Sequence, residues 1–148
     1  MEIDIWEFII KIGAAALSGA LMGLEREYKG KPAGLKTYSL VALGAATFIT
    51  ISLMFQSSDS TDMTRIVGQV VVGVGFLGAG VILHEKDNTA VTGLATSAAI
   101  WCSAAAGCLA GFGLYLPLLA LSVFVILINL IFGFLNGKLK NMNNNNED

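Results

Sequence analysis

The chain has 148 residues, of which 55% are hydrophobic and 14% charged, with a net charge of −2 and a mean hydropathy of +0.70. Its acidic balance and its lack of a basic stripe exclude nucleic-acid binding, because neutralising phosphates requires clustered Lys and Arg. The hydropathy exceeds that of a soluble domain and indicates that lipid is the surrounding solvent.

Five apolar runs follow one another, each near the ~20 residues that a helix needs to cross ~30 Å of hydrocarbon. They cover residues 5–24, 38–55, 66–83, 91–112 and 114–135. The alternative, a soluble helical bundle, would need a polar face on each helix, whereas residues 68–83 and 114–128 are apolar nearly all round. The sequence therefore predicts an all-α integral membrane protein, a bundle of about five transmembrane helices within residues 1–137.

Seven of the nine basic residues fall on one side of this predicted bundle. They are Arg26, Lys29, Lys31, Lys36, Lys86, Lys138 and Lys140. The positive-inside rule then predicts that the N-terminus lies outside and the C-terminus in the cytoplasm. The asparagine-rich tract at 141–148 has nothing to bury, and we expect residues 138–148 to be a disordered polar tail.

Along the first helix, Lys11, Ser18 and Glu25 share a narrow stripe with Glu7. We expect this stripe to face protein rather than lipid. Two interpretations of Lys11 stay open, because it lies only about 9 Å from the outer end of the run. It is either a lysine that extends to the surface beside Glu7 or an intramembrane charge in a functional cavity.

The third run carries small residues on two faces. They are Gly68, Gly75 and Ala79 on one face, and Gly73 and Gly80 on the other. Glycine on both sides implies neighbours on both sides, so we expect this helix at the bundle centre. Gln69, beside Gly73, is either hydrogen-bonded to a neighbouring helix or lines a small polar gap.

The fourth run separates small and polar residues from bulky ones. The small face, expected to pack on protein, comprises Thr92, Thr96, Ala99, Ser103, Ala106 and Ala110, whereas Leu94, Trp101 and Phe112 are expected to meet lipid. Cys102 and Cys108 point in different directions and cannot bridge within one helix. We interpret them as small packing residues.

The second and fourth helices begin alike, with Gly-Leu-Lys-Thr at 34–37 and Gly-Leu-Ala-Thr at 93–96. One interpretation is a parallel duplication of two helical hairpins. Both helix N-termini would then present free N–H groups at the cytoplasmic surface near Glu25 and Glu27. This cluster is our preferred candidate site.

No catalytic constellation is present, since His84 is the single histidine and no nucleophile elbow, phosphate-binding loop or zinc spacing occurs. We predict neither an enzyme nor a cofactor, and the sequence specifies no metal ligand.

Four ordered motifs resemble the MgtC/SapB membrane family over roughly residues 10–115. They are GLERE at 23–27, AGLKT at 33–37, QVVVGVGFLGAGVI at 69–82, and GLAT at 93–96 followed by Trp101 and Cys102. The resemblance implies a multi-pass protein of the bacterial inner membrane, tied to growth under magnesium limitation, survival inside host cells and restraint of the ATP synthase. It also implies that the protein acts through other membrane proteins, since the family is not established as a transporter.

The resemblance also assigns residues. It matches Glu25 and Arg26 to an acidic and basic pair of the family, and Cys102 to a cysteine found in some members. Lys36 stands where arginine is usual, and Ala95 departs from the Thr or Asn often found there. Longer members carry a soluble C-terminal domain, for which we expect no counterpart in this sequence.

Two functions are consistent with these features. The first is a non-enzymatic regulator, with the chain itself as a homo-oligomer or other membrane proteins as partners, and we expect Glu25→Ala to abolish it without preventing insertion. The second is an ion carrier or channel with a polar path along the first and third helices. The candidate binding residues are Lys11, Ser18, Glu25, Arg26, Lys36, Thr37, Gln69, Gly73, Gly75, Gly80, Thr96 and Cys102.

Overall fold

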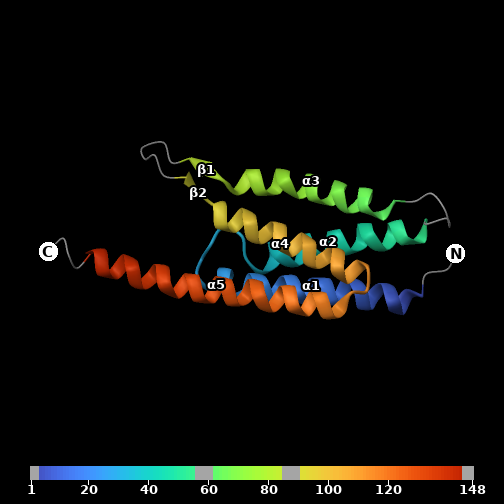
Figure 1. Ribbon diagram of the computed structural model, residues 1–148, viewed down its shortest axis with the longest axis horizontal. Coiled ribbons are helices and arrows are strands. Elements are labelled where there is room, and N and C mark those ends of the chain that lie inside the picture. The colour runs from blue at the N-terminus through green and yellow to red at the C-terminus, as the bar shows by residue number, and fades with distance from the viewer. Residues whose placement is uncertain (1–3, 56–61, 85–90, 145–148) are drawn as a thin grey trace.

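The fold is a bundle of α-helices lying side by side, seen in a computed structural model that describes residues 4–55, 62–84 and 91–144 (Figure 1). The helices are α1 (Ile5–Tyr28), α2 (Leu35–Met54), α3 (Met63–Val81), α4 (Leu94–Gly111) and α5 (Tyr115–Asn144). All five are long and apolar enough to span a membrane, α5 through Tyr115–Asn136. The predicted all-α membrane bundle is confirmed.

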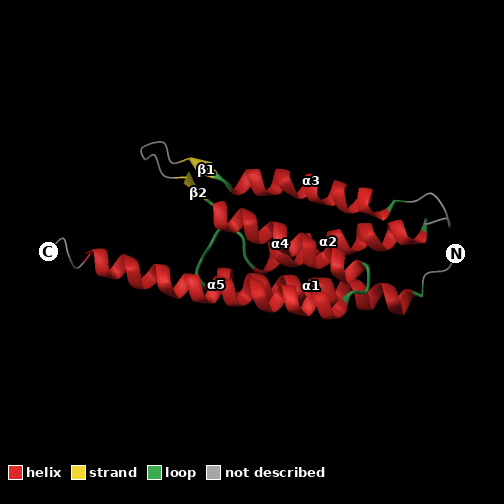
Figure 2. Ribbon diagram, viewed as in Figure 1, coloured by secondary structure: helices red, strands yellow, loops and turns green. Residues whose placement is uncertain are grey.

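The connection between α3 and α4 includes a short antiparallel ladder that the sequence did not predict. Strands β1 (Leu83–His84) and β2 (Val91–Thr92) pair two residues each (Figure 2). Thr92 therefore lies in β2, exposed, and not on the buried face of the fourth helix as expected.

Two of the helices begin at an acidic cap. The Asp4 carboxylate accepts a hydrogen bond from the N–H of Trp6 at 3.0 Å. The Asp62 carboxylate accepts from the hydroxyl of Thr64 at 2.6 Å and from its N–H at 2.9 Å. These two bonds hold the pKa of Asp62 below its ordinary 3.8, because they favour the ionised form. The N-cap positions of α2 and α4 are instead glycines, with no side chain to accept such a bond.

The centre of the bundle is α4, which packs against α1, α2, α3 and α5. More than half of its span is buried, 56%, against 6% for α3. The prediction that the third helix occupies the centre is therefore wrong. A Cβ added to Gly68, Gly73, Gly75 or Gly80 would meet nothing within 4 Å. These four glycines of α3 lie among bulky exposed residues such as Val72 and Phe76, and only Val74 and Gly78 are buried in this helix.

Glycine allows α2 to approach both α1 and α4 closely. A Cβ at Gly19 of α1 would lie 2.5 Å from the carbonyl oxygen of Tyr38, and a Cβ at Gly111 of α4 would lie 2.8 Å from that of Ala46. Gly23 and Gly107 make the corresponding contacts one turn away on the same two helices. These glycine pairs, spaced four residues apart, let helix backbones touch and gain van der Waals contact.

The two faces expected for the fourth helix are largely confirmed. Thr96, Ala99, Ser103, Ala106 and Ala110 are buried, whereas Leu94 and Trp101 are more than half exposed. Phe112 is only half-buried and is not on the exposed face as expected.

α5 extends further than its apolar run. It continues to Asn144, so the first part of the tract expected to be disordered is helical, and residues 145–148 lie outside the described residues. Adding a turn to an existing helix costs little, because the unfavourable step is nucleation.

Candidate functional site

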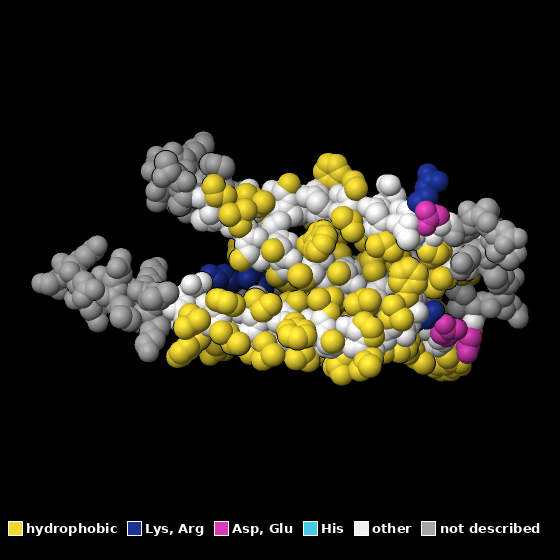
Figure 3. Space-filling model, viewed as in Figure 1, with side chains coloured by type: hydrophobic (Ala, Val, Ile, Leu, Met, Phe, Trp, Pro, Cys, Tyr) yellow, Lys and Arg dark blue, Asp and Glu magenta, His cyan; other side chains and the backbone are white. Residues whose placement is uncertain are grey.

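The preferred candidate cluster lies at the end of the bundle where α1 ends and where α2 and α4 begin. We call this the basic end, since Arg26, Lys29, Lys31 and Lys36 belong to it. Figure 3 shows Lys and Arg side chains recessed above α5 at this end, while apolar side chains cover most of the visible bundle. That this end faces the cytoplasm stays a prediction.

Arg26 is buried at the contact between α1 and α4, with 7% of its surface exposed. Its Nη2 donates a hydrogen bond to Oγ1 of Thr96, which is 3% exposed in the first turn of α4. Nε of Arg26 has no acceptor in the part of the chain that the structure describes. The ion pairs found there join other residues, so no described carboxylate neutralises this guanidinium.

The position of Arg26 is electrostatically unfavourable. The first N–H groups of a helix have no intrahelical acceptor, and the helix dipole is positive at that end. A buried charge without a partner costs several kcal/mol in real proteins. An anion placed between Arg26 and the start of α4 would lower both costs, that of the unpaired buried charge and that of placing it beside the positive end of a helix.

Two further buried polar groups lack partners among the described residues, and sequence reasoning missed both. The hydroxyl of Tyr38 in α2 is fully buried, within electrostatic range of Arg26 and Glu25. Nδ2 of Asn129 in α5 is the other. The sequence offered a signal for each of these residues. Tyr38 directly follows the 34–37 motif, and Asn129 is the one side-chain amide in the apolar part of α5 before Asn136.

The acidic residues of this end are engaged elsewhere. Glu25 forms an ion pair with Lys29 rather than with the adjacent Arg26. Adjacent residues on a helix point about 100° apart, so the two side chains face different neighbours. Oε2 of Glu27 accepts a hydrogen bond from the N–H of Leu35 at 3.1 Å and so caps α2.

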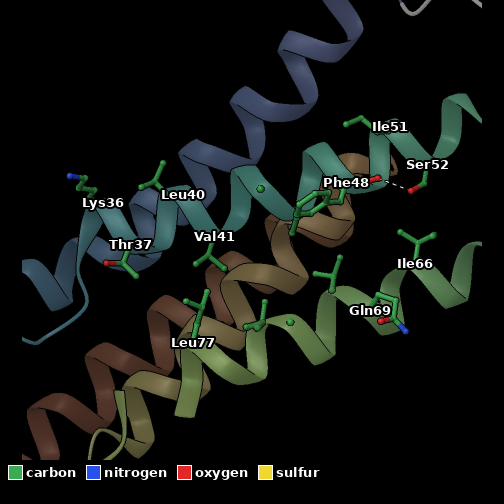
Figure 4. A pocket seen from close by; sticks show the side chains of 15 residues that line it. Lys36, Thr37, Leu40, Val41, Phe48, Ile51, Ser52, Ile66, Gln69 and Leu77 are labelled. Carbon is green, nitrogen blue, oxygen red and sulfur yellow. Dashed lines mark hydrogen bonds between the residues drawn. The ribbon is translucent and has the colours of Figure 1, made fainter. Parts of the chain in front are cut away.

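Four candidate residues lie on a different surface. Lys36 and Thr37 of α2, with Gln69 and Gly73 of α3, line a groove of about 810 Å³ between these two helices (Figure 4). Gln69 is exposed and forms no hydrogen bond with the described residues, so the interpretation that it bonds a neighbouring helix is wrong. Its other predicted role also fails, because the groove it lines is mainly apolar rather than a small polar gap.

The remaining candidates are dispersed. Nζ of Lys11 pairs with Oε1 of Glu7 at 2.6 Å, as the first interpretation proposed, and Lys11 is 8% exposed. Ser18 shares a hydrogen bond of 2.7 Å with Ser122 of α5. Gly75 and Gly80 lie on the open surface of α3.

Cys102 is half-buried and Cys108 is buried, both as free thiols in α4. No group of three His, Cys, Asp or Glu in the described ranges could hold a metal ion.

The structure thus brings Arg26 and Thr96 together but does not assemble the polar path along the first and third helices. α1 packs on α2, α4 and α5, and α3 packs on α2 and α4. Lys11 and Ser18 therefore lie on a different side of the bundle core from Gln69.

The Arg26–Thr96 contact joins two of the four sequence motifs, and comparison with known proteins identifies their family. A profile of the MgtC family matches residues 12–138. The chain belongs to the MgtC family. It is 47% identical over 124 residues to Protein MgtC of Salmonella typhimurium, covering 84% of this chain and 52% of the relative. It is 48% identical over 118 residues to Protein MgtC of Brucella abortus, covering 80% and 48%.

The chain spans about half the length of these MgtC relatives. No solved structure matches it. The matched region contains all five membrane-spanning segments apart from the first residues of α1, so the MgtC kinship and the transmembrane bundle describe the same part of the chain.

Proposed function

We propose that this chain is a non-enzymatic regulator in the bacterial inner membrane, which binds other membrane proteins through the surface formed by Arg26 and the start of α4. The observation that carries the proposal is the buried Arg26 guanidinium, held by Thr96 and without a carboxylate among the described residues. An acidic side chain of a partner would supply the missing charge. Membership of the MgtC family supports a role under magnesium limitation, with the ATP synthase as one such partner.

Access to this surface is through the first turn of α4. Leu94 and Ala95, which precede Thr96, are both exposed. A partner helix lying against them would bring its side chains close to the Arg26–Thr96 contact. An arginine suits this role because its planar guanidinium binds a carboxylate through two parallel hydrogen bonds.

The proposal is tested by placing a photo-crosslinking amino acid at Ala95 in living bacteria and identifying the adducts in membranes. We expect a membrane-protein adduct that Arg26→Gln reduces by at least about tenfold, because losing one member of a buried charge pair costs ~2–5 kcal/mol. Arg26→Lys should restore the adduct only in part, since lysine lacks the planar fork.

Two controls accompany this test. Lys31→Gln, which removes an exposed charge from the following loop, should leave the adduct unchanged. A crosslinker at Val72, exposed on α3, reports background contacts. An adduct insensitive to Arg26→Gln would overturn the proposal.

The competing function, an ion carrier, has less support because its polar residues lie on separate interfaces. Purified protein in liposomes tests it directly. Selective ion flux that Glu25→Gln or Gln69→Leu abolishes would replace the regulator with a carrier.

A further inference from the structure

The groove between α2 and α3 has the shape and polarity of a lipid site. Its walls are apolar over most of their length, from Leu40 and Val41 to Phe48 and Leu77 (Figure 4). Lys36 and Thr37 both lie at one end of the groove, at the start of α2. Because α2 and α3 both span a membrane by length and hydropathy, the groove faces hydrocarbon between its ends.

The groove is long enough to hold an acyl chain. Along α2 the lining runs from Lys36 to Ser52, about 24 Å at ~1.5 Å per residue. The part within ~15 Å of Lys36 belongs to one leaflet of a ~30 Å hydrocarbon core.

Two glycines create the room in that part of the groove. Gly44 of α2 and Gly73 of α3 both line it, and a Cβ at either position would meet nothing within 4 Å. A larger residue at either position would extend into the space rather than into the protein core.

The charge at the end of the groove complements a phosphate. Lys36 is exposed and has no acidic partner in the described part of the chain. The N–H of Leu35 donates a hydrogen bond to Glu27. The next two N–H groups of α2, those of Lys36 and Thr37, donate to no described residue. Free N–H groups at the positive end of a helix, beside an ammonium and a hydroxyl, are suited to binding a phosphate.

We propose that this groove binds one anionic phospholipid from the leaflet at the basic end. Its phosphate lies against Lys36, Thr37 and the free N–H groups of α2, and one acyl chain extends along Leu40 and Val41 towards Gly44 and Gly73. Basic groups beside a membrane surface attract anionic lipids, which gives this site its preference. The surface used by Arg26 lies against α4 and is separate from it.

The test equilibrates the purified chain with vesicles of equal phosphatidylglycerol and phosphatidylethanolamine, and counts bound lipids by native mass spectrometry. We expect one phosphatidylglycerol per chain, preferred about fivefold, the factor that ~1 kcal/mol per Lys at an anionic surface gives. Lys36→Gln should abolish the preference. The matched control Lys31→Gln, an exposed lysine that does not line the groove, should keep it.

A second pair of variants tests the groove itself. Gly73→Leu should lower the retention of both lipids at least fivefold by filling the groove. Gly75→Leu, on the same helix and equally open but outside the lining, should retain them. Circular dichroism confirms that both variants are folded. Equal binding of the two lipids to the parent chain, or equal retention by both glycine variants, would overturn the proposal. A dimer mass that Gly73→Leu abolishes would assign the groove to a second copy of the chain and overturn it as well.

Discussion

The beginnings of α2 and α4 differ in what surrounds their positive ends. At α2, Gly34 has φ −127° and the Glu27 carboxylate caps the next N–H. At α4, Gly93 has φ +91°, no side chain caps the helix, and the Arg26 guanidinium contacts its first turn. Two adjacent residues of α1 thus supply an acid to one helix and a base to the other. Helices that begin with nearly the same four residues can therefore have different electrostatic surroundings, because α2 begins beside a carboxylate of its own chain and α4 begins beside a buried cation.

The largest difference should appear when each N-cap glycine is replaced by alanine. Gly93→Ala should lower the free energy of unfolding by about 2–4 kcal/mol, since a left-handed backbone costs an L residue ~1–2 kcal/mol and the new Cβ would also collide with the carbonyl of Val81. Gly34→Ala should cost about 1 kcal/mol or less, because its φ is ordinary and the Cβ meets mainly the flexible Glu27 carboxylate. Unfolding in mixed micelles measures both. Equal losses would contradict the distinction between the two caps.

An intermediate effect should follow from removing the acceptor of Arg26. Thr96→Val should destabilise the fold by about 1–3 kcal/mol, since it leaves a buried donor unsatisfied. Arg26→Met should be neutral or stabilising by about 1 kcal/mol in the isolated chain, because it removes an uncompensated buried charge. In the double variant most of the cost of Thr96→Val should disappear.

The same unfolding assay measures the free energies of unfolding of Thr96→Val, Arg26→Met and the double variant. Gly34→Ala serves as its reference for a small effect at the other helix start. A loss of about 3 kcal/mol or more for Arg26→Met alone would show that Arg26 already has a counterion.

The smallest effect should come from the acidic cap of α2. Glu27→Gln should cost about 0.3–1 kcal/mol, the range for a charge at a helix N-terminus. Hydrogen exchange of the Leu35 amide should accelerate accordingly, because Glu27 is its acceptor. Glu25→Gln, whose carboxylate pairs with Lys29, should leave that amide unchanged. Acceleration by both variants would mean that general charge, and not the cap, protects α2.

Sequence reasoning was reliable where the signal was local. The spans were predicted from run length and hydropathy, and the buried face of α4 from helical periodicity. The Lys11–Glu7 pair followed from their spacing of one turn. Arg26 and Thr96 were both chosen from motifs, although nothing in either motif indicated that they contact each other.

Sequence reasoning failed where the answer depended on which helix lies beside which. The glycines of α3 indicated a central helix, yet glycine permits close approach without requiring it, and α4 with its Ala and Ser residues occupies the centre. The alternative function places Gln69 and Lys11 on one path, because both are polar within apolar runs. They face different helices, and no pattern within a single run contains that information.

The sequence by itself determined that this chain crosses a membrane about five times and which motifs relate it to its family, because hydropathy, length and motif order are properties of contiguous residues. Only the tertiary structure decided that Arg26 lies buried at the start of α4 without an anion, and that α2 and α3 leave an apolar groove ending at Lys36. Both features depend on which side chains of different helices meet, and that is settled by packing between segments far apart in the chain.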